Sequence, residues 1–151
     1  MQKECDIYLC HPAKTDRLKF VSLFDAGFIF HNQKEYEGYL NINVKRIKLI
    51  SVLTDLRRNG FECFSVPVEY RDCQNLPLNA ALDLANTQAK KIGASVASQT
   101  PKCSPVFWLF DLRYENSVEK VASVVMIDRL DGHVWSDSEH EEYMYDYNSI
   151  F

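Results

Sequence analysis

The two longest strand-like stretches of the chain follow one another closely, and they constrain the fold more than any other feature. PVFWLFDLRYE (105–115) and KVASVVMIDRLDGHVW (120–135) are rich in the β-branched and aromatic residues that favour strands. Asn116-Ser117 between them is typical of a hairpin turn. Asp131-Gly132 predicts a second tight turn, which returns the chain through residues 133–135. We therefore expect antiparallel pairing in this half of the chain.

The N-terminal half contains two further strand patterns and one ambiguous stretch. CDIYLC (5–10) and FECFSVPVEY (61–70) both alternate with period two, and Pro67 places the second strand at an edge or a bulge because it lacks an N–H. Residues 14–40 fit either a strand pair or a helix followed by a strand. We favour a helix through Leu23 and a strand near residues 28–31. The polar residues 95–104 are interpreted as a loop.

Three helices are predicted from apolar residues spaced at 3.6. The first, residues 44–59, would begin at Asn43. It would bury Val44, Ile47, Ile50 or Ser51, Leu53 and Leu56, and its outer face would be basic, with Lys45, Arg46, Lys48, Arg57 and Arg58. The second would begin at Asn75 and pack through Leu78, Ala81, Leu82, Ala85, Ala89 and Ile92. The third, residues 137–149, would begin with a capping box of Ser136 and Glu139.

These elements predict an α+β protein with a mainly antiparallel sheet and about three helices packed on one face. A chain of 151 residues fits a single domain, residues 1–151. No apolar run reaches the roughly 18 residues that a membrane helix needs, and MQKECDIYLC lacks the apolar core of a signal peptide. The five cysteines show no C-x-x-C spacing. We therefore expect a cytoplasmic protein whose thiols are reduced and buried as small apolar groups.

Negative charge is concentrated near the C-terminal end of the sequence. From Asp128 to Phe151 there are seven acids and one base, a net charge of −6, whereas the whole chain carries −4 and the remaining residues sum to +2. Nucleic acid is thus not the expected partner, although the basic face of residues 44–59 could contact phosphates.

The motifs of common catalytic and metal sites are missing from the sequence. His140 lies among Glu139, Glu141 and Glu142, but consecutive helical residues point in different directions, so no metal site is expected there. Cys10 and His11 are adjacent on a strand and face opposite sides. The chain has neither G-x-S-x-G nor a glycine-rich phosphate loop. No catalytic residue and no cofactor is expected on this reading.

Two aspartates leave an enzymatic alternative open. Asp111 and Asp128 each follow an apolar run, so burial could raise the pKa of either, and the two could lie at the same end of one hairpin. Structural ion pairs with Arg113 and Arg129 are the preferred interpretation. The alternative is a small-molecule-binding or hydrolytic enzyme of a cone-like α+β fold, with Asp111 or Asp128 as base and a pocket lined by Phe107, Trp108, Phe110 and Trp135.

The predicted C-terminal helix has two different sides. His140, Tyr143, Met144, Tyr147 and Phe151 would pack on the sheet, while Glu141, Glu142, Tyr145 and Asp146 would face outward. Tyrosine offers wide contact area at low entropic cost, and carboxylates around it would steer a basic partner.

Residues 76–135 resemble the helix-plus-hairpin unit of PepSY-type and related small bacterial domains. The V-x-D-x-x-x-G-x-V pattern of those domains is matched by Val125, Asp128, Gly132 and Val134, with Ile127 inserted beside the aspartate. In size and in its acidic, aromatic segment, the chain is also similar to immunity proteins of bacterial toxin–immunity systems such as contact-dependent inhibition. That resemblance implies binding of a toxin without catalysis.

The sequence thus predicts a non-enzymatic immunity protein that neutralises a toxin, such as a basic nuclease, by direct binding. Its predicted contact residues are Asp131, Asp137, Glu141, Glu142, Tyr145 and Asp146. The expected partner is a basic toxin domain, not nucleic acid or a membrane. Self-association through an exposed strand edge at residues 66–70, giving a homodimer, is a third alternative.

Overall fold

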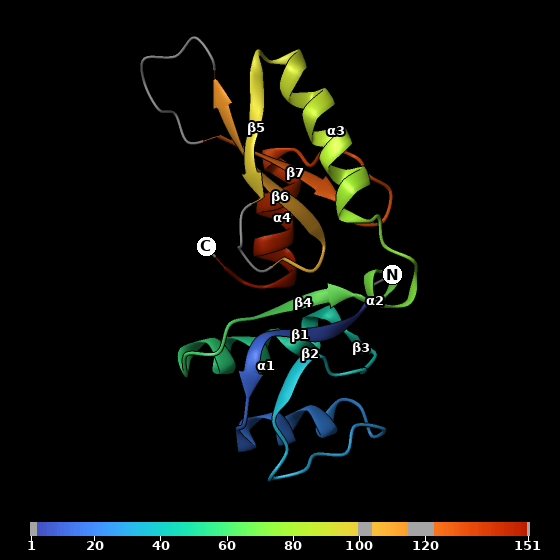
Figure 1. The fold of residues 1–151 in the computed structure, drawn as a ribbon. Helices are drawn as coiled ribbons and strands as arrows, with labels where there is room; N and C mark the ends of the chain where they lie inside the picture. The colour runs from blue at the N-terminus through green and yellow to red at the C-terminus, as the bar shows by residue number, and fades with distance from the viewer. Residues whose placement is uncertain (1–2, 100–103, 115–122, 151) are drawn as a thin grey trace. The chain divides into compact units, whose positions relative to one another are not determined.

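In the computed structural model, which describes residues 3–99, 104–114 and 123–150, the chain divides into two compact units. Unit 1 comprises residues 1–72 and 141–151, and unit 2 comprises residues 73–140 (Figure 1). Antiparallel sheets and several helices confirm the α+β class, with the strands divided between two sheets. The prediction of a single domain stays a prediction.

The sheet of unit 1 is built around β1 (Glu4–Ala13), which has strands on both of its edges. β4 (Cys63–Pro67) pairs with one edge, from Cys5 opposite Pro67 to Leu9 opposite Cys63. β2 (Tyr36–Tyr39) and β3 (Val44–Lys45) follow one another along the other edge. All these pairings are antiparallel. The strand predicted at residues 5–10 is therefore confirmed, and it lies at the centre of the sheet.

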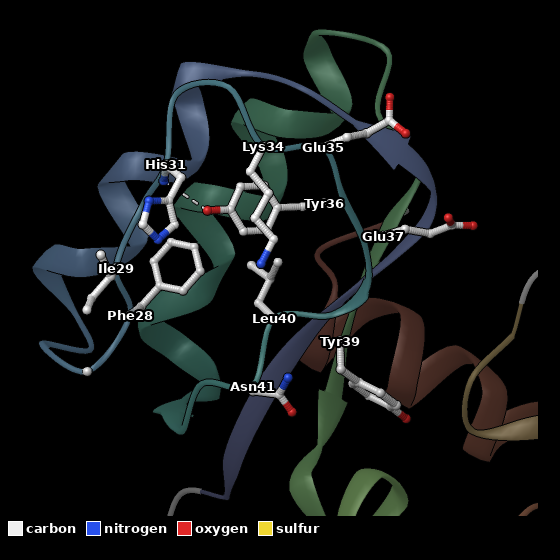
Figure 2. A pocket seen from close by; sticks show the side chains of 11 residues that line it. Phe28, Ile29, His31, Lys34, Glu35, Tyr36, Glu37, Tyr39, Leu40 and Asn41 are labelled. Atoms are coloured by element: carbon white, nitrogen blue, oxygen red, sulfur yellow. Dashed lines mark hydrogen bonds between the residues drawn. The ribbon is translucent and has the colours of Figure 1, made fainter.

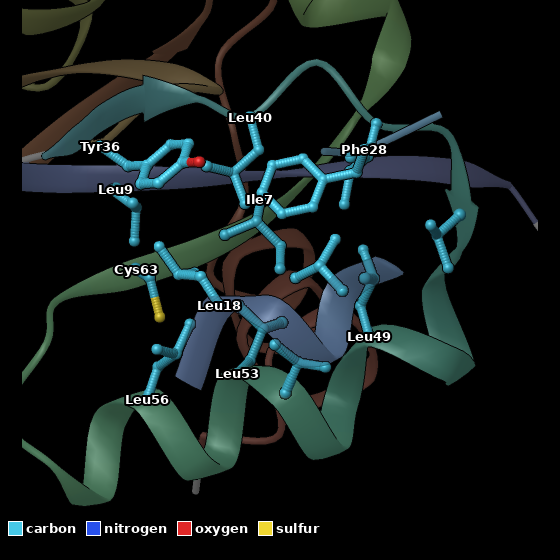
Figure 3. Packing of buried hydrophobic residues seen from close by; sticks show 14 of the residues in the cluster. Ile7, Leu9, Leu18, Phe28, Tyr36, Leu40, Leu49, Leu53, Leu56 and Cys63 are labelled. Carbon is cyan, nitrogen blue, oxygen red and sulfur yellow. The ribbon is translucent and has the colours of Figure 1, made fainter. Parts of the chain in front are cut away.

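Helix α1 (Arg46–Arg58) supplies the apolar layer that covers this sheet. Its buried residues, Leu49, Val52, Leu53 and Leu56, recur at helical spacing. Figure 3 shows three of these leucines packed against Ile7 and Leu9 of β1 and against Leu18. Leu18 belongs to a 3₁₀ helix, Asp16–Leu23, which confirms the helix predicted through Leu23.

Several predictions for unit 1 are wrong in detail. Residues 28–31 form no strand, because that segment is a loop leading into β2. Helix α1 begins three residues after Asn43, and Ile47 is 52% exposed because the buried stripe runs through Leu49 instead. Residues 68–70 belong to a short helix, α2 (Val68–Asp72), so the second strand stops at Pro67.

A buried ion pair links α2 to the sheet. The Arg71 guanidinium donates to the Asp6 carboxylate at 3.1 Å, to the Ile42 carbonyl at 2.7 Å and to the Asn43 side chain at 2.7 Å. Burial raises the pKa of Asp6, while the hydrogen bond from Arg71 opposes that rise. The pair holds three segments of unit 1 together.

Unit 2 has a three-stranded antiparallel sheet in the order β5 (Ala94–Gln99), β6 (Phe107–Tyr114) and β7 (Ser123–Asp128). The pairing of β6 with β7 confirms the two strand-like stretches, while the turn predicted at 116–117 lies outside the described residues. Residues 95–104 were expected to be a loop, but residues 95–99 belong to β5. Val134 bridges back to Ile127, as the Asp131-Gly132 turn predicts.

Helix α3 (Leu78–Lys91) packs on this sheet through small side chains. Ala81, Ala85 and Ala89 are fully buried and contact a core that includes Phe110 and Ile127. The larger residues predicted in the same stripe, Leu78, Leu82 and Ile92, remain partly exposed. Close approach of the helix through alanine therefore replaces the broad apolar stripe that was expected.

The capping box at residues 136–139 is present, but the C-terminal helix has a different shape from the one predicted. Glu139 N–H donates to Ser136 Oγ and Ser136 N–H donates to Glu139 Oε1, each at 3.1 Å. Helix α4 (Asp137–Glu142) then gives way to a π-helical turn, Tyr143–Tyr147. Helix α4 crosses the boundary between the units, which falls between His140 and Glu141.

Candidate protein-binding surface

The C-terminal segment of unit 1, residues 141–150, is anchored on the outer edge of β4. Tyr143 OH donates to the Ser65 carbonyl at 2.8 Å, and the Ser65 N–H donates to Asn148 Oδ1 at 2.7 Å. Both anchoring side chains are buried, and burial raises the pKa of the Tyr143 phenol. The prediction of an exposed strand edge at residues 66–70 is wrong for residues 68–70, which are helical. The edge of β4 just before it is covered at Ser65.

The π-helical turn explains how both anchors face the same strand. In a regular α-helix two residues five positions apart point about 140° away from each other. The wider π-helical turn at Tyr143–Tyr147 brings Tyr143 and Asn148 to one side. The inward position predicted for Tyr143 is confirmed, and the anchoring role of Asn148 was missed.

Two arginines of α1 hold the same segment through its backbone. Arg46 donates to the Asp146 carbonyl at 2.8 Å, and its guanidinium carbon lies 5.2 Å from the Tyr147 ring centroid. Arg57 donates to both the carbonyl and the side-chain oxygen of Asn148. Burial lowers the pKa of Arg57. These two members of the predicted basic face thus have an internal role, and neither donates to a carboxylate of the segment in these bonds.

The outward side of the segment carries the predicted acids. Glu141 and Glu142 are exposed, Tyr145 is 58% exposed, and Asp146 is half-buried. Within the described residues, no salt bridge joins the carboxylates of Glu141, Glu142 or Asp146 to a base. Spacings of three and four residues place these side chains on neighbouring positions of a helical surface. We call Glu141, Glu142, Tyr145 and Asp146 the acidic surface.

The other two predicted contact residues, Asp131 and Asp137, belong to unit 2. Asp137 is exposed in the first turn of α4. Asp131 is bound to His133, whose ring also contacts Glu139 at 2.6 Å. The His133 backbone N–H is the main cause that lowers the pKa of Asp131, assisted by the His133 ring. The six predicted residues therefore do not form one cluster within a single unit.

The His133 cluster is the one place in the described residues where potential metal ligands converge. Ligand atoms of Asp128, Asp131 and His133 lie within 4.8 Å of one another. Both ring nitrogens of His133 are engaged, Nδ1 with Asp131 and Nε2 with Glu139, so hydrogen bonding accounts for the arrangement without an ion. His140 packs edge-on against Phe107 with ring centroids 5.7 Å apart.

The two aspartates of the enzymatic alternative are separated in the sheet of unit 2. Asp128 pairs with Phe107 and Asp111 with Val124, so the prediction that they lie at the same end of a hairpin is wrong. Asp128 is 3% exposed and accepts from Leu130 N–H and from the Trp135 indole, each at 2.8 Å. Asp111 accepts a hydrogen bond from Ser98 at 3.4 Å.

The predicted aromatic pocket is divided between two faces of that sheet. Phe107 packs against Trp135 with centroids 4.9 Å apart, whereas Phe110 lies in the α3 core. Trp108 donates to the Leu76 carbonyl at 2.9 Å and is covered by Arg129, whose guanidinium carbon lies 3.8 Å from the ring centroid. Neighbouring strand residues point to opposite faces, so Phe107 and Trp108 cannot line one cavity.

A pocket of about 470 Å³ lies instead in unit 1, next to the loop before β2. Figure 2 shows His31, Lys34, Tyr36 and Leu40 around it. Neither Asp111 nor Asp128 is among its lining residues. Sequence reasoning missed this site because the loop, residues 24–35, shows no regular periodicity.

The cysteines differ from the uniform set of buried thiols that was expected. Cys5 and Cys63 are free and buried, and burial raises the pKa of each thiol to about 11. They are therefore protonated at neutral pH and poor nucleophiles, consistent with packing roles. Cys73 is free but exposed, and Cys10 is disulfide-bonded. The neighbouring His11 contacts Glu62 at 3.1 Å.

In the part of the chain that the structure describes, no helix combines the length and apolarity required to traverse a bilayer. Comparisons with protein-family models, curated proteins and solved structures found no match to the chain.

Proposed function

We propose that this chain is a non-enzymatic binding protein that uses the acidic surface to dock a basic protein, and that it acts as an immunity protein masking a toxin. The observation that carries the proposal is the combination of a firmly anchored backbone with carboxylates that have no basic partner among the described residues. Asp131 has a partner within its own unit, so it is not included in the proposed contact.

The anchoring favours binding over a merely solvated acidic face. Arg46 and Arg57 bind main-chain carbonyls, which holds the segment in place without an ion pair to its carboxylates in these bonds. A surface whose backbone is already ordered loses less conformational entropy when a partner docks. Tyr145, exposed between acids, would supply the apolar contact area that a purely charged patch lacks.

The charge of the acidic surface indicates the kind of partner. Clustered carboxylates accelerate association with a cationic protein and make the association rate depend on ionic strength. A basic nuclease domain fits this requirement, because its own nucleic-acid-binding face is cationic. Docking there would block the nuclease without any chemistry by the inhibitor. We place this activity in the cytoplasm, where such a toxin would act.

Co-expression with the product of an adjacent gene that encodes a basic toxic domain would test the proposal. The wild-type chain should restore growth and bind the toxin with an association rate that falls as salt rises. The double variant Glu142→Lys/Asp146→Lys should lose both effects. Glu4→Lys/Asp16→Lys, which makes the same charge change at exposed positions of unit 1, should keep them. Equal protection and equal salt dependence for both variants would reject the acidic surface as the interface.

A further inference from the structure

We propose that His133 forms a pH-dependent bridge within unit 2: its protonated ring binds both Asp131 and Glu139, and loss of one proton releases Glu139 from the ring. Asp131 lies in the turn after β7, and Glu139 lies in the first turn of α4. The bridge therefore determines whether the ring ties the start of α4 to that turn. This inference concerns a different site from the acidic surface and does not rest on the proposed function.

The contacts of the His133 ring define its protonation state. Nδ1 lies 2.5 Å from Asp131 Oδ1, and Nε2 lies 2.6 Å from Glu139 Oε2. A neutral imidazole has a single N–H, so its other nitrogen would present a lone pair to a carboxylate. Only the imidazolium, which has two N–H groups, can donate to both carboxylates. The arrangement of these three side chains is therefore that of the protonated ring.

The groups around the ring favour its charged form. Among the described residues, no lysine or arginine forms a salt bridge with Asp131 or Glu139, and both carboxylates depend on His133 for a positive partner. Asp128 of β7 brings a third carboxylate within 4.8 Å of the ring nitrogen. Trp135, whose ring lies nearly parallel to that of His133 at 6.4 Å, carries no charge. The pKa of Glu139 is lowered mainly by its hydrogen bond with His133, as an ion pair requires.

The neutral ring should keep Asp131 and release Glu139. Asp131 Oδ1 also accepts from the His133 backbone N–H at 3.0 Å, so the turn holds this carboxylate next to Nδ1 whatever the charge of the ring. The proton that remains should therefore stay on Nδ1, and the lone pair of Nε2 would repel Glu139 Oε2. Glu139 Oε1 accepts from Ser136 N–H at 3.1 Å, so Glu139 can turn away from the ring and still cap α4.

His11 of unit 1 provides a matched comparison within the chain. In the described part of the chain its ring contacts one carboxylate, with Nε2 3.1 Å from Glu62 Oε2. A neutral ring satisfies that contact with its single N–H on Nε2. The neutral forms of the two histidines should therefore be opposite tautomers, with the proton on Nδ1 in His133 and on Nε2 in His11.

The ring ¹⁵N and carboxyl ¹³C signals of the labelled full-length chain, followed from about pH 5 to about pH 9, would test the bridge. We expect both ring nitrogens of His133 to be protonated at the lower pH and only Nδ1 at the higher pH. The Glu139 carboxyl signal should change with the same midpoint as the ring, and the Asp131 signal should change less. A neutral His133 that is protonated on Nε2, or a Glu139 signal that does not follow the ring, would overturn the inference.

Two glutamine variants separate the bridge from a general effect of charge. Glu139→Gln removes one carboxylate from the ring, so the titration midpoint of His133 should move to a lower pH. Glu62→Gln removes one negative charge from the contact with His11 and should leave the His133 midpoint unchanged. An equal change in both variants, or no change in either, would show that Glu139 does not bind the His133 ring.

Discussion

Asn148→Ala should destabilise unit 1 strongly, because one buried amide satisfies polar groups from three parts of the chain. Asn148 Oδ1 accepts from Ser65 N–H at 2.7 Å and from Arg57 at 3.0 Å, and Nδ2 donates to the Tyr143 carbonyl at 3.2 Å. Alanine leaves the Ser65 N–H buried without a partner, which costs about 1–3 kcal/mol. Arg57 keeps its hydrogen bonds to the Asn148 and Cys63 carbonyls. Losing its bond to Asn148 Oδ1 therefore contributes only about 1 kcal/mol more. We therefore expect a decrease of about 3 kcal/mol in the free energy of unfolding.

Urea denaturation followed by far-UV circular dichroism would measure the global effect, and native-state hydrogen exchange at the Ser65 amide would measure the local one. Asn59→Ala is the control, because Asn59 makes one exposed hydrogen bond to the Asp55 carbonyl, and it should cost less than about 0.5 kcal/mol. If Asn148→Ala and Asn59→Ala lose the same stability, and Ser65 stays protected, the anchoring role of Asn148 is refuted.

The same experiment tests whether the chain behaves as a single domain. Both tryptophans, Trp108 and Trp135, belong to unit 2, so their fluorescence reports on that unit alone. A single cooperative domain would show coincident transitions by fluorescence and circular dichroism, and both would shift in Asn148→Ala. A fluorescence transition that does not move would show that the two units unfold independently.

Three further outcomes are expected. Burial lowers the pKa of His133, but hydrogen bonds with Glu139 and Asp131 outweigh it and leave that pKa raised above 6.5. The protonated ring stabilises the folded state fully at a pH below the pKa that His133 has in the unfolded chain. That stabilisation is lost as the pH rises through the pKa of His133 in the folded protein. His133→Gln should therefore destabilise the protein more at about pH 6 than at about pH 8.5. The difference should be under about 1 kcal/mol, because the ring is partly exposed. Urea titrations at the two pH values that show no difference would contradict this expectation. Gly132→Ala should cost slightly more stability than Gly93→Ala in thermal denaturation. Both glycines have positive φ, but only at Gly132 would a Cβ meet a side chain, the end of Leu84 at 2.9 Å, which would have to shift. Equal losses would contradict this expectation. Alkylation of denatured, non-reduced protein should leave Cys10 unlabelled, because Cys10 is disulfide-bonded. If Cys10 is also disulfide-bonded in protein taken from quickly acid-quenched cells, the proposed cytoplasmic location is contradicted, since the cytosol keeps thiols reduced.

Local chemistry explains which parts of the fold could be predicted from the sequence. The capping box of Ser136 and Glu139 depends on residues three apart, and the strands around 107–114 and 123–128 have strong β-forming composition. By contrast, β5 has the polar sequence ASVASQ and becomes a strand because β6 offers it an edge. Its strand character comes from tertiary pairing, which composition does not report.

The candidate sites show the same division between local and long-range information. The exposure of Glu141, Glu142 and Tyr145 follows from helical spacing and was predicted. The anchoring of Asn148 could not be predicted, because Ser65 and Arg57 are 83 and 91 residues away in sequence. The pocket beside Lys34 depends on a loop shaped by single side-chain hydrogen bonds, such as that from Asn43 N–H to Asp25.

The covering of β4 by the segment around Tyr143 and Asn148 has a consequence for biosynthesis. A ribosome delivers β1, α1 and β4 well before it reaches the residues that complete the strand edge, whatever follows them. During that interval the nascent sheet presents the unsatisfied Ser65 amide and carbonyl to any neighbouring extended chain. Polypeptides released by premature termination after Asp72 should consequently be prone to aggregate and to recruit chaperones, while full-length molecules escape that fate as soon as the final turn docks.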